Sequence, residues 1–297
     1  MQPFWSNYHS HTRFCDGVDS PLTYLQMAVE KGVMSYGFSS HAPLPFQHNC
    51  KWVMKNEALK KYLQEIEEAK CLIDQEIQAY RSLEIDYVPG KFGPGHESLK
   101  DFALDYTLGS IHFVDQFHSG ALWEIDGPHQ VFRDGLEQIF DNDIKEVVTR
   151  YYELTREMLE YDPPDILGHL DKIKIQNYRS FTDSSPLFSE KDDWYQDQVM
   201  KTLEIVKEKE VIVEVNTRGI YQKKSLETYP GPGILKIIKA LEIPVTVSSD
   251  CHHPQQITSE FVNTVELLIS LGFSKVKILW GHQWVDARLT EKGYLID

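Results

Sequence analysis

The feature that most limits the fold of this sequence is a repeated alternation of short β-rich runs with longer helical runs. Seven runs have the character of strands, at 4–8, 36–40, 81–87, 106–113, 166–170, 211–217 and 245–249. Such alternation predicts parallel βαβ units, in which each helix returns the chain to the start of the next strand. A further apolar run at 276–280 is a candidate for an eighth strand.

Helical patterns fill most of the intervals between these strands. They cover 56–80, 141–161, 189–209, 231–241 and 257–271, and another helix follows the first strand. For that first helix, Ser20 suits the N-cap, Pro21 the first turn and Gly32 the stop. With 297 residues and 41% hydrophobic content the chain can bury one large core, so we expect a single domain over 1–297.

The composition of the chain argues against nucleic acids and membranes as partners. The net charge of -15 opposes binding to nucleic-acid backbones, and no apolar run reaches the roughly 20 residues of a membrane span. The N-terminus lacks the order of a secretory signal, and the four cysteines lack disulfide or zinc-finger spacing. We therefore expect a cytoplasmic protein with free thiols and no membrane or nucleic-acid partner.

Residues of metal-ligand type stand at or just beyond the C-terminal ends of six of the seven predicted strands. Parallel α/β folds assemble active sites at that end. With one acid in the first loop, these residues are His9, His11, Asp16, His41, Glu84, His112, His169, Asp250 and His252. Imidazole and carboxylate together suit zinc, iron or manganese, and nine ligands are too many for one ion.

Each of these residues taken alone has a simpler explanation. His169, for example, could be a core histidine bonded to a carbonyl, whereas Glu84 inside an apolar run is costly to bury without a partner. The coincidence favours a site, because six of the 12 histidines fall at strand ends. His9 and His11 are also two residues apart, as are Asp250 and His252, so each pair lies on one face of its strand.

Six motifs occur in the order HSHT at 9–12, GFSSHAP at 37–43, LEIDYVPG at 83–90, GSIH at 109–112, GHLD at 168–171 and SDCH at 249–252. In these motifs the chain resembles the PHP (polymerase and histidinol phosphatase) phosphoesterases, and among them the stand-alone histidinol-phosphatase branch. The resemblance spans most of the chain. It implies a distorted (βα)7 TIM-like barrel with the active site at the C-terminal ends of the strands and three divalent transition-metal ions.

The resemblance also implies how the ligands are shared. One ion would take His9, His11, Glu84 and Asp250. A second would take Glu84 as a bridge with His112 and His169. The third would take Asp16, His41 and His252.

The activity implied by the resemblance is hydrolysis of L-histidinol phosphate to L-histidinol and phosphate, in histidine biosynthesis. As a hypothesis, a metal-bound hydroxide attacks phosphorus while Glu84 bridges two ions, and Asp250 or a metal-bound water helps to protonate the departing alkoxide. Arg218 and Arg13 are candidates for phosphate contacts, although each could instead form a surface salt bridge.

The segment from 114 to 140 is long for a connection, aromatic, and without clear periodicity. It is typical of a loop that covers a substrate, although a packed surface excursion fits equally well. It offers three carboxylates for the substrate ammonium, Asp115, Glu124 and Asp126. For the imidazole it offers Phe117, His118, Trp123 and His129.

Three other functions compete with this one. A PHP-type phosphoesterase could act on another small phosphomonoester or a nucleotide. A related metal barrel could hydrolyse carbon–nitrogen bonds, although such barrels typically carry a lysine-type bridge where this chain has Glu84. The metals could also brace a non-enzymatic scaffold.

Overall fold

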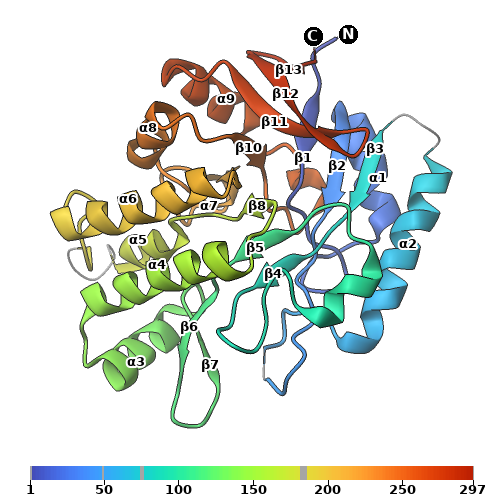
Figure 1. The fold of residues 1–297 in the computed structure, drawn as a ribbon. Helices are drawn as coiled ribbons and strands as arrows, with labels where there is room; N and C mark the ends of the chain where they lie inside the picture. The colour runs from blue at the N-terminus through green and yellow to red at the C-terminus, as the bar shows by residue number, and fades with distance from the viewer. Residues whose placement is uncertain (1, 49, 74–76, 181–185, 297) are drawn as a thin grey trace.

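Short parallel strands form two sheets in the computed structural model, which describes residues 2–48, 50–73, 77–180 and 186–296 (Figure 1). The first sheet contains, in spatial order, β1 (Trp5–Asn7), β2 (Val33–Phe38) and β3 (Gln78–Arg81). The second contains β10 (Val245–Ser248), β9 (Ile212–Asn216), β8 (Ile166–Leu167), β5 (Leu108–Ser110) and β4 (Glu84–Asp86).

Two isolated parallel bridges join the edges of these sheets. His41 pairs with Glu84 at one junction, and Ser10 pairs with Cys251 at the other. Strands β3 and β4 are successive parts of one extended segment, which pairs first with β2 and then with β5. Within the described residues, seven parallel segments therefore follow one another in space, which confirms the expected α/β class with parallel strands and is consistent with the (βα)7 arrangement. At the two junctions the hydrogen-bonded ladder between neighbouring strands is reduced to single bridges, so the arrangement is distorted there.

The helices pack outside this ring of seven strand segments (Figure 1). The longer ones are α1 (Pro21–Glu30), α2 (Leu59–Leu72), α3 (His129–Phe140), α4 (Ile144–Tyr161), α6 (Asp193–Glu208), α8 (Pro232–Ala240) and α9 (Phe261–Ser270). As predicted, the side chain of Ser20 accepts the Thr23 N–H and caps α1. The apolar face of α2 is buried through Leu59, Leu63 and Ile66.

Short helical turns complete the connections between strands. They are η1 (Asn56–Ala58), η2 (Glu97–Phe102), η3 (Lys172–Lys174), α5 (Ile175–Ser180), α7 (Arg218–Tyr221) and η4 (Pro254–Gln256). Turns η3 and α7 begin just beyond the ends of β8 and β9, so they carry their first residues to the same end of the ring as the predicted ligands.

The candidate eighth strand does not join the ring. Instead β11 (Lys275–Trp280) pairs antiparallel with β12 (Gln283–Thr290), which pairs with β13 (Gly293–Leu295). The turn at Gly281 and His282 has positive φ at both residues, 58° and 62°. Two positive φ values in a two-residue loop give a tight hairpin that matches strand twist, so the chain reverses instead of crossing over.

The helix predicted over 56–80 is shorter than expected. It ends at Leu72, and Gln78–Arg81 form β3, while 74–76 lie outside the described residues. Parallel pairing of β3 with Ser35–Phe38 of β2 overrides the helical spacing of the local sequence.

The segment from 114 to 140 belongs to a packed hairpin and a helix. These are β6 (Phe113–Gln116), β7 (Leu122–Glu124) and α3 (His129–Phe140). Trp123 is fully buried against Phe132 and Phe140 of α3. Gly135 permits this contact, because a Cβ there would lie 2.1 Å from the Trp123 ring nitrogen. The excursion is thus packed, although its inner edge reaches the site described below.

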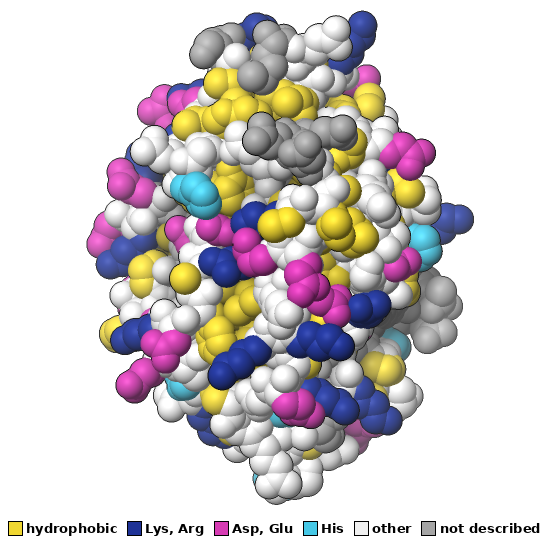
Figure 2. All heavy atoms as spheres, turned by 90° about the vertical axis from the view of Figure 1, so that its right-hand side faces the viewer, with side chains coloured by type: hydrophobic (Ala, Val, Ile, Leu, Met, Phe, Trp, Pro, Cys, Tyr) yellow, Lys and Arg dark blue, Asp and Glu magenta, His cyan; other side chains and the backbone are white. Residues whose placement is uncertain are grey.

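The surface carries charges of both signs. Figure 2 shows basic and acidic side chains interspersed with hydrophobic ones on the face turned to the viewer. In the described parts of the chain, no helix has both the length and the apolar character needed to cross a bilayer.

Candidate metal centre

The nine predicted ligand residues meet at one end of the strand ring. Glu84 begins β4, and the others lie on segments that follow parallel strands. Most are buried, with Asp16 and His252 the more accessible members. The C-terminal ends of parallel strands share one edge, and closure of the ring brings the first and last pairs of ligands together.

Glu84 lies at the centre of the cluster and has both carboxylate oxygens directed at histidine rings. Its Oε2 is 3.0–3.4 Å from ring nitrogens of His9, His11 and His41. Its Oε1 is 3.0 Å from His169 Nε2 and 3.6 Å from His112 Nε2. One carboxylate therefore faces two sets of imidazoles at once.

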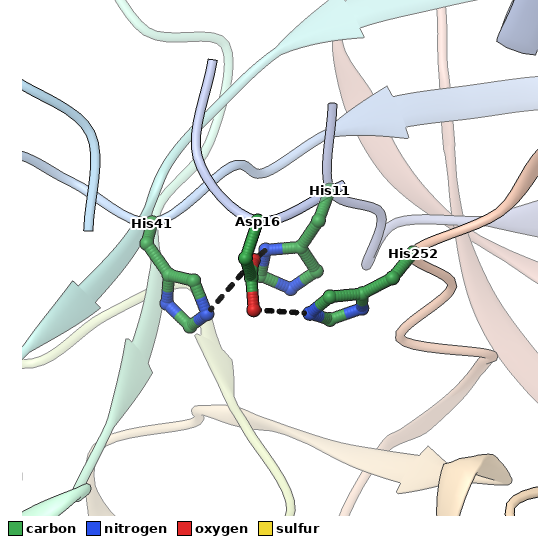
Figure 3. A group of neighbouring side chains, drawn as sticks. All are labelled: His11, Asp16, His41 and His252. Carbon is green, nitrogen blue, oxygen red and sulfur yellow. Dashed lines mark hydrogen bonds and ion pairs between the residues drawn. The ribbon is translucent and has the colours of Figure 1, made fainter. Parts of the chain in front are cut away.

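The other two carboxylates lie on the side of the cluster towards the first loop. Asp250 Oδ1 is 3.1 Å from His11 Nε2 and 3.6 Å from His9 Nε2. Asp16 Oδ2 is 3.1 Å from His252 Nε2, and its Oδ1 is 3.8 Å from His41 Nε2 (Figure 3). Figure 3 shows the Asp16 carboxylate surrounded by the rings of three histidines.

These separations suit metal ions. Bond lengths of about 2.0–2.2 Å place neighbouring ligand atoms of one ion about 3.0–3.5 Å apart. Three buried ring nitrogens, His9 Nε2, His11 Nε2 and His41 Nδ1, have no hydrogen-bond partner in the described structure although all three face Glu84. Buried polar atoms are rarely left in this state, so the donor set fits a bound cation.

Protonation favours the same assignment. Burial lowers the pKa of His11 to about 4 and that of His41 to about 3, so both rings are neutral at neutral pH. Although burial acts against it, Glu214 and Asp250 raise the pKa of His9 well above its ordinary value. An ion bound by His9 would therefore displace a proton.

Two buried acids that were not predicted as site residues contact histidine rings at Nδ1, the ring nitrogen that does not face Glu84. Glu214 Oε1 is 2.7 Å from His9 Nδ1, and its Oε2 accepts the backbone N–H of His169 at 2.8 Å. Asp86 Oδ1 is 2.8 Å from His112 Nδ1. Such carboxylates fix the tautomer and orientation of a ligating imidazole. A detectable signal existed for Glu214, because it is an acid inside an apolar strand, as Glu84 is.

Lys172 is a further buried member that was not predicted. Its Nζ lies 3.1 Å from His112 Nε2, 3.5 Å from His169 Nε2 and 3.0 Å from Asp126 Oδ2. It stands in η3, where no strand or helix periodicity indicates the direction of a side chain, so its place in the site could not be predicted from its neighbours in sequence.

A cavity of ≈ 220 Å³ opens beside the histidine cluster. Besides ligand residues, its lining includes Trp52, Glu124, Asp126, Lys172, Arg218 and Tyr229. Arg218 is held by a 2.6 Å bond from Nη1 to the carbonyl oxygen of Asp250 and by contact with the His252 ring. The wall therefore combines cations near the metal ligands with two carboxylates and two aromatic rings.

Several of the predicted substrate contacts lie elsewhere. Arg13 is exposed and pairs with Glu65 of α2 at 2.8 Å, which is the surface salt bridge that was its alternative. His118 is exposed at the turn between β6 and β7 and does not line the cavity. Asp115 is exposed, and His129 bonds to Gln176 at 3.0 Å.

Two of the predicted ligands have unusual backbone conformations. His169 and Asp250 have φ values of +22° and +52°. Residues other than glycine rarely adopt positive φ, and such strain gathers at functional sites. In both cases the strained residue lies two positions beyond the end of its strand and presents its side chain to Glu84 or His11.

Comparisons with known proteins agree with this geometry. The PHP domain family model matches residues 7–218, which leaves Asp250 and His252 beyond the matched range. A Deinococcus radiodurans protein named "Probable histidinol-phosphatase" is 26% identical over 265 residues, covering 89% of this chain and 92% of that protein. The histidinol-phosphatase of Bacillus subtilis is 22% identical, with 82% and 92% covered.

A solved structure has the same fold. The crystal structure of a Lactococcus lactis histidinol phosphate phosphatase, complexed with zinc, L-histidinol and phosphate, matches with a TM-score of 0.70 and 18% identity. The match covers 95% of this chain and 98% of that one.

Proposed function

Because this chain belongs to the PHP family, we propose that it is a metal-dependent histidinol-phosphatase, which hydrolyses L-histidinol phosphate to L-histidinol and phosphate in histidine biosynthesis. The observation that carries the proposal is the Glu84 carboxylate. Its two oxygens face two sets of imidazole rings, and a cavity large enough for a small molecule opens beside them. The choice of substrate rests on the proteins named histidinol-phosphatase, to which this chain is similar over nearly their whole length.

We infer three donor groups for about three divalent ions, which could be zinc, iron or manganese. The first donor group is His9, His11, Glu84 and Asp250. The second donor group is Glu84, His112 and His169. The third donor group is Asp16, His41 and His252. When bound, the ions would neutralise the phosphate and activate water for attack on phosphorus.

Arg218 and Asp250 have separate tasks in this proposal. Arg218 lines the cavity with its guanidinium fixed, so it can orient phosphate oxygens without losing much side-chain entropy. Although burial opposes ionisation, His9 and Arg218 hold the pKa of Asp250 well below its ordinary range. An ionised Asp250 suits the first donor group, because a carboxylate ligand must be deprotonated to bind an ion.

The amine of the substrate would meet the carboxylates at the inner edge of the hairpin. Glu124 accepts the Trp52 ring N–H at 3.0 Å, and its partial burial raises its pKa. A carboxylate in that state gains from an ammonium partner, because a buried charge is costly when unpaired. Trp52 and Tyr229 offer aromatic faces to the imidazole.

Phosphate release from a panel of monoesters tests this function. We expect L-histidinol phosphate to give the highest kcat/KM, with amine-free alkyl phosphates and nucleotides lower by about two orders of magnitude or more. Glu124→Gln should reduce that preference, whereas Asp115→Asn, at an exposed site in the same hairpin, should leave it unchanged. Equal hydrolysis of a nucleotide or alkyl phosphate would remove the biosynthetic assignment and leave a general PHP phosphoesterase.

A further inference from the structure

Lys172 stands where the metal cluster meets the substrate cavity. Its side chain is 9% exposed, and its Nζ is within 3.5 Å of ring nitrogens of both histidines in the second donor group. It is also 3.0 Å from Asp126 Oδ2, on the cavity wall. The ammonium thus lies between two alternative sets of partners.

The ring of His112 cannot serve an ammonium and a metal ion together. Its Nδ1 faces Asp86 at 2.8 Å, which assigns that nitrogen as the donor and leaves one lone pair, on Nε2. Lys172 Nζ is 3.1 Å from this Nε2, so the ammonium N–H points at the lone pair that an ion would need. An ion and the ammonium at this position would also repel each other.

Asp126 offers the ammonium another position. Its Oδ2 already contacts Nζ, and it lies on a wall of the cavity rather than in the histidine cluster. Lysine has a flexible four-carbon stem, so a small rotation can move Nζ away from His112 while it keeps its bond to Asp126.

We propose that Lys172 competes with the ion of the second donor group, so that this ion binds more weakly than the others and drives the ammonium towards Asp126 and the cavity. This inference rests on the metal centre of the proposed function. It makes the second donor group a mixed site, occupied by a side-chain cation at low metal concentration and by a metal ion at high concentration. It also shifts the Lys172 ammonium, which already lines the cavity, from His112 towards the cavity wall when that group is loaded.

Zinc binding to the full chain tests the proposal without measuring turnover. Equilibrium dialysis with elemental analysis gives the stoichiometry and the dissociation constant of each zinc ion. The wild type should bind about three zinc ions at saturation and lose one of them first as free zinc falls. Lys172→Met, which is uncharged and of similar length, should tighten the weakest ion by about tenfold or more, because Nε2 of His112 is no longer contested.

Two further variants separate competition from a general effect of charge. Lys224→Met also removes a cation from the cavity wall, and it should change the weakest affinity much less. Asp126→Asn should act in the opposite direction, because the displaced ammonium loses its alternative carboxylate. Circular dichroism of each variant checks that the fold is retained.

The proposal is overturned if Lys172→Met leaves the weakest zinc affinity unchanged, if Lys224→Met tightens it equally, or if Asp126→Asn tightens it. Should Lys172→Met fail to fold, the Asp126→Asn result decides alone. Failure of the proposed function has a different signature, namely zinc affinities that respond as expected in a protein that releases no phosphate from L-histidinol phosphate.

Discussion

Replacement of Glu214 by glutamine should disable His9 as a ligand without changing the shape of the core. In the wild type, Glu214 Oε2 accepts from the His169 backbone N–H at 2.8 Å and from Asn216 Nδ2 at 3.1 Å, while Oε1 faces His9 Nδ1. A glutamine has one carbonyl oxygen, which best faces the side with two donors. Its NH₂ group then faces His9 Nδ1 and requires an acceptor there.

The consequence is a shift of tautomer. With Nδ1 as acceptor, the proton of a neutral His9 moves to Nε2, which is the nitrogen 3.1 Å from Glu84 Oε2. That nitrogen then has no lone pair for an ion. Loss of such an orienting partner lowers metal affinity by about 10- to 100-fold, or about 1.4–2.8 kcal/mol. Folding should lose only about 1 kcal/mol, because a neutral hydrogen bond replaces a charge-assisted one.

Competition against a chromophoric chelator measures the affinity, and thermal unfolding of the chelated protein measures the stability. Glu266→Gln removes the same charge at an exposed position of α9 and is the matched control. The reasoning is refuted if Glu214→Gln binds its ions as tightly as the wild type, or if the control weakens binding by the same factor.

Three further outcomes are expected. Glu84→Gln should cost more turnover and more bound metal than Asp16→Asn, because Glu84 faces two sets of imidazoles; equal losses in both assays would contradict this. Arg218→Lys should lower kcat/KM by about tenfold or more while Arg13→Lys has no effect, and similar kinetics for the two variants would exclude the phosphate role. Burial raises the pKa of Glu190 to about 7, so the wild type loses stability as pH rises towards 7. Glu190→Gln cannot ionise, so its advantage in Tm should grow between about pH 4.5 and about pH 7 and level off above that, and a constant difference would be inconsistent with that pKa.

Convergence of the nine ligands was predictable because it depends on strand direction alone. Parallel strands end at one edge, so a residue such as His169 reaches the site wherever its strand stands in the ring. The roles of the other buried acids depend instead on how far along its strand each acid stands and on which ring it reaches. Glu214 and Glu84 are both acids in apolar strands, and alternation cannot say which one reaches the cluster and which one supports a ring from behind.

Contacts between distant segments account for the remaining differences. Arg13 was a candidate for a phosphate contact, but in the folded chain α2 places Glu65 beside it. Helix α3 was missed as a helix although Phe132, Leu136 and Phe140 repeat every four residues on one face, because the aromatic hairpin before it obscured the pattern. The single-domain organisation over 1–297 stays a prediction.

The junction between β1 and β10 has a consequence for unfolding rates. Within the described residues, that seam has one isolated backbone bridge, Ser10 with Cys251, and side-chain hydrogen bonds between Asn7 and Ser249. Asp250 also approaches His11 and His9 directly across it. An ion in the first donor group would tie together segments about 240 residues apart in the chain, as a covalent crosslink does. If the seam opens before the rest of the ring, metal loading should slow unfolding far more than it speeds folding. In the chelated protein the His11 amide, which donates to the Cys251 carbonyl oxygen across the seam, would then exchange early, and the loaded protein would protect it.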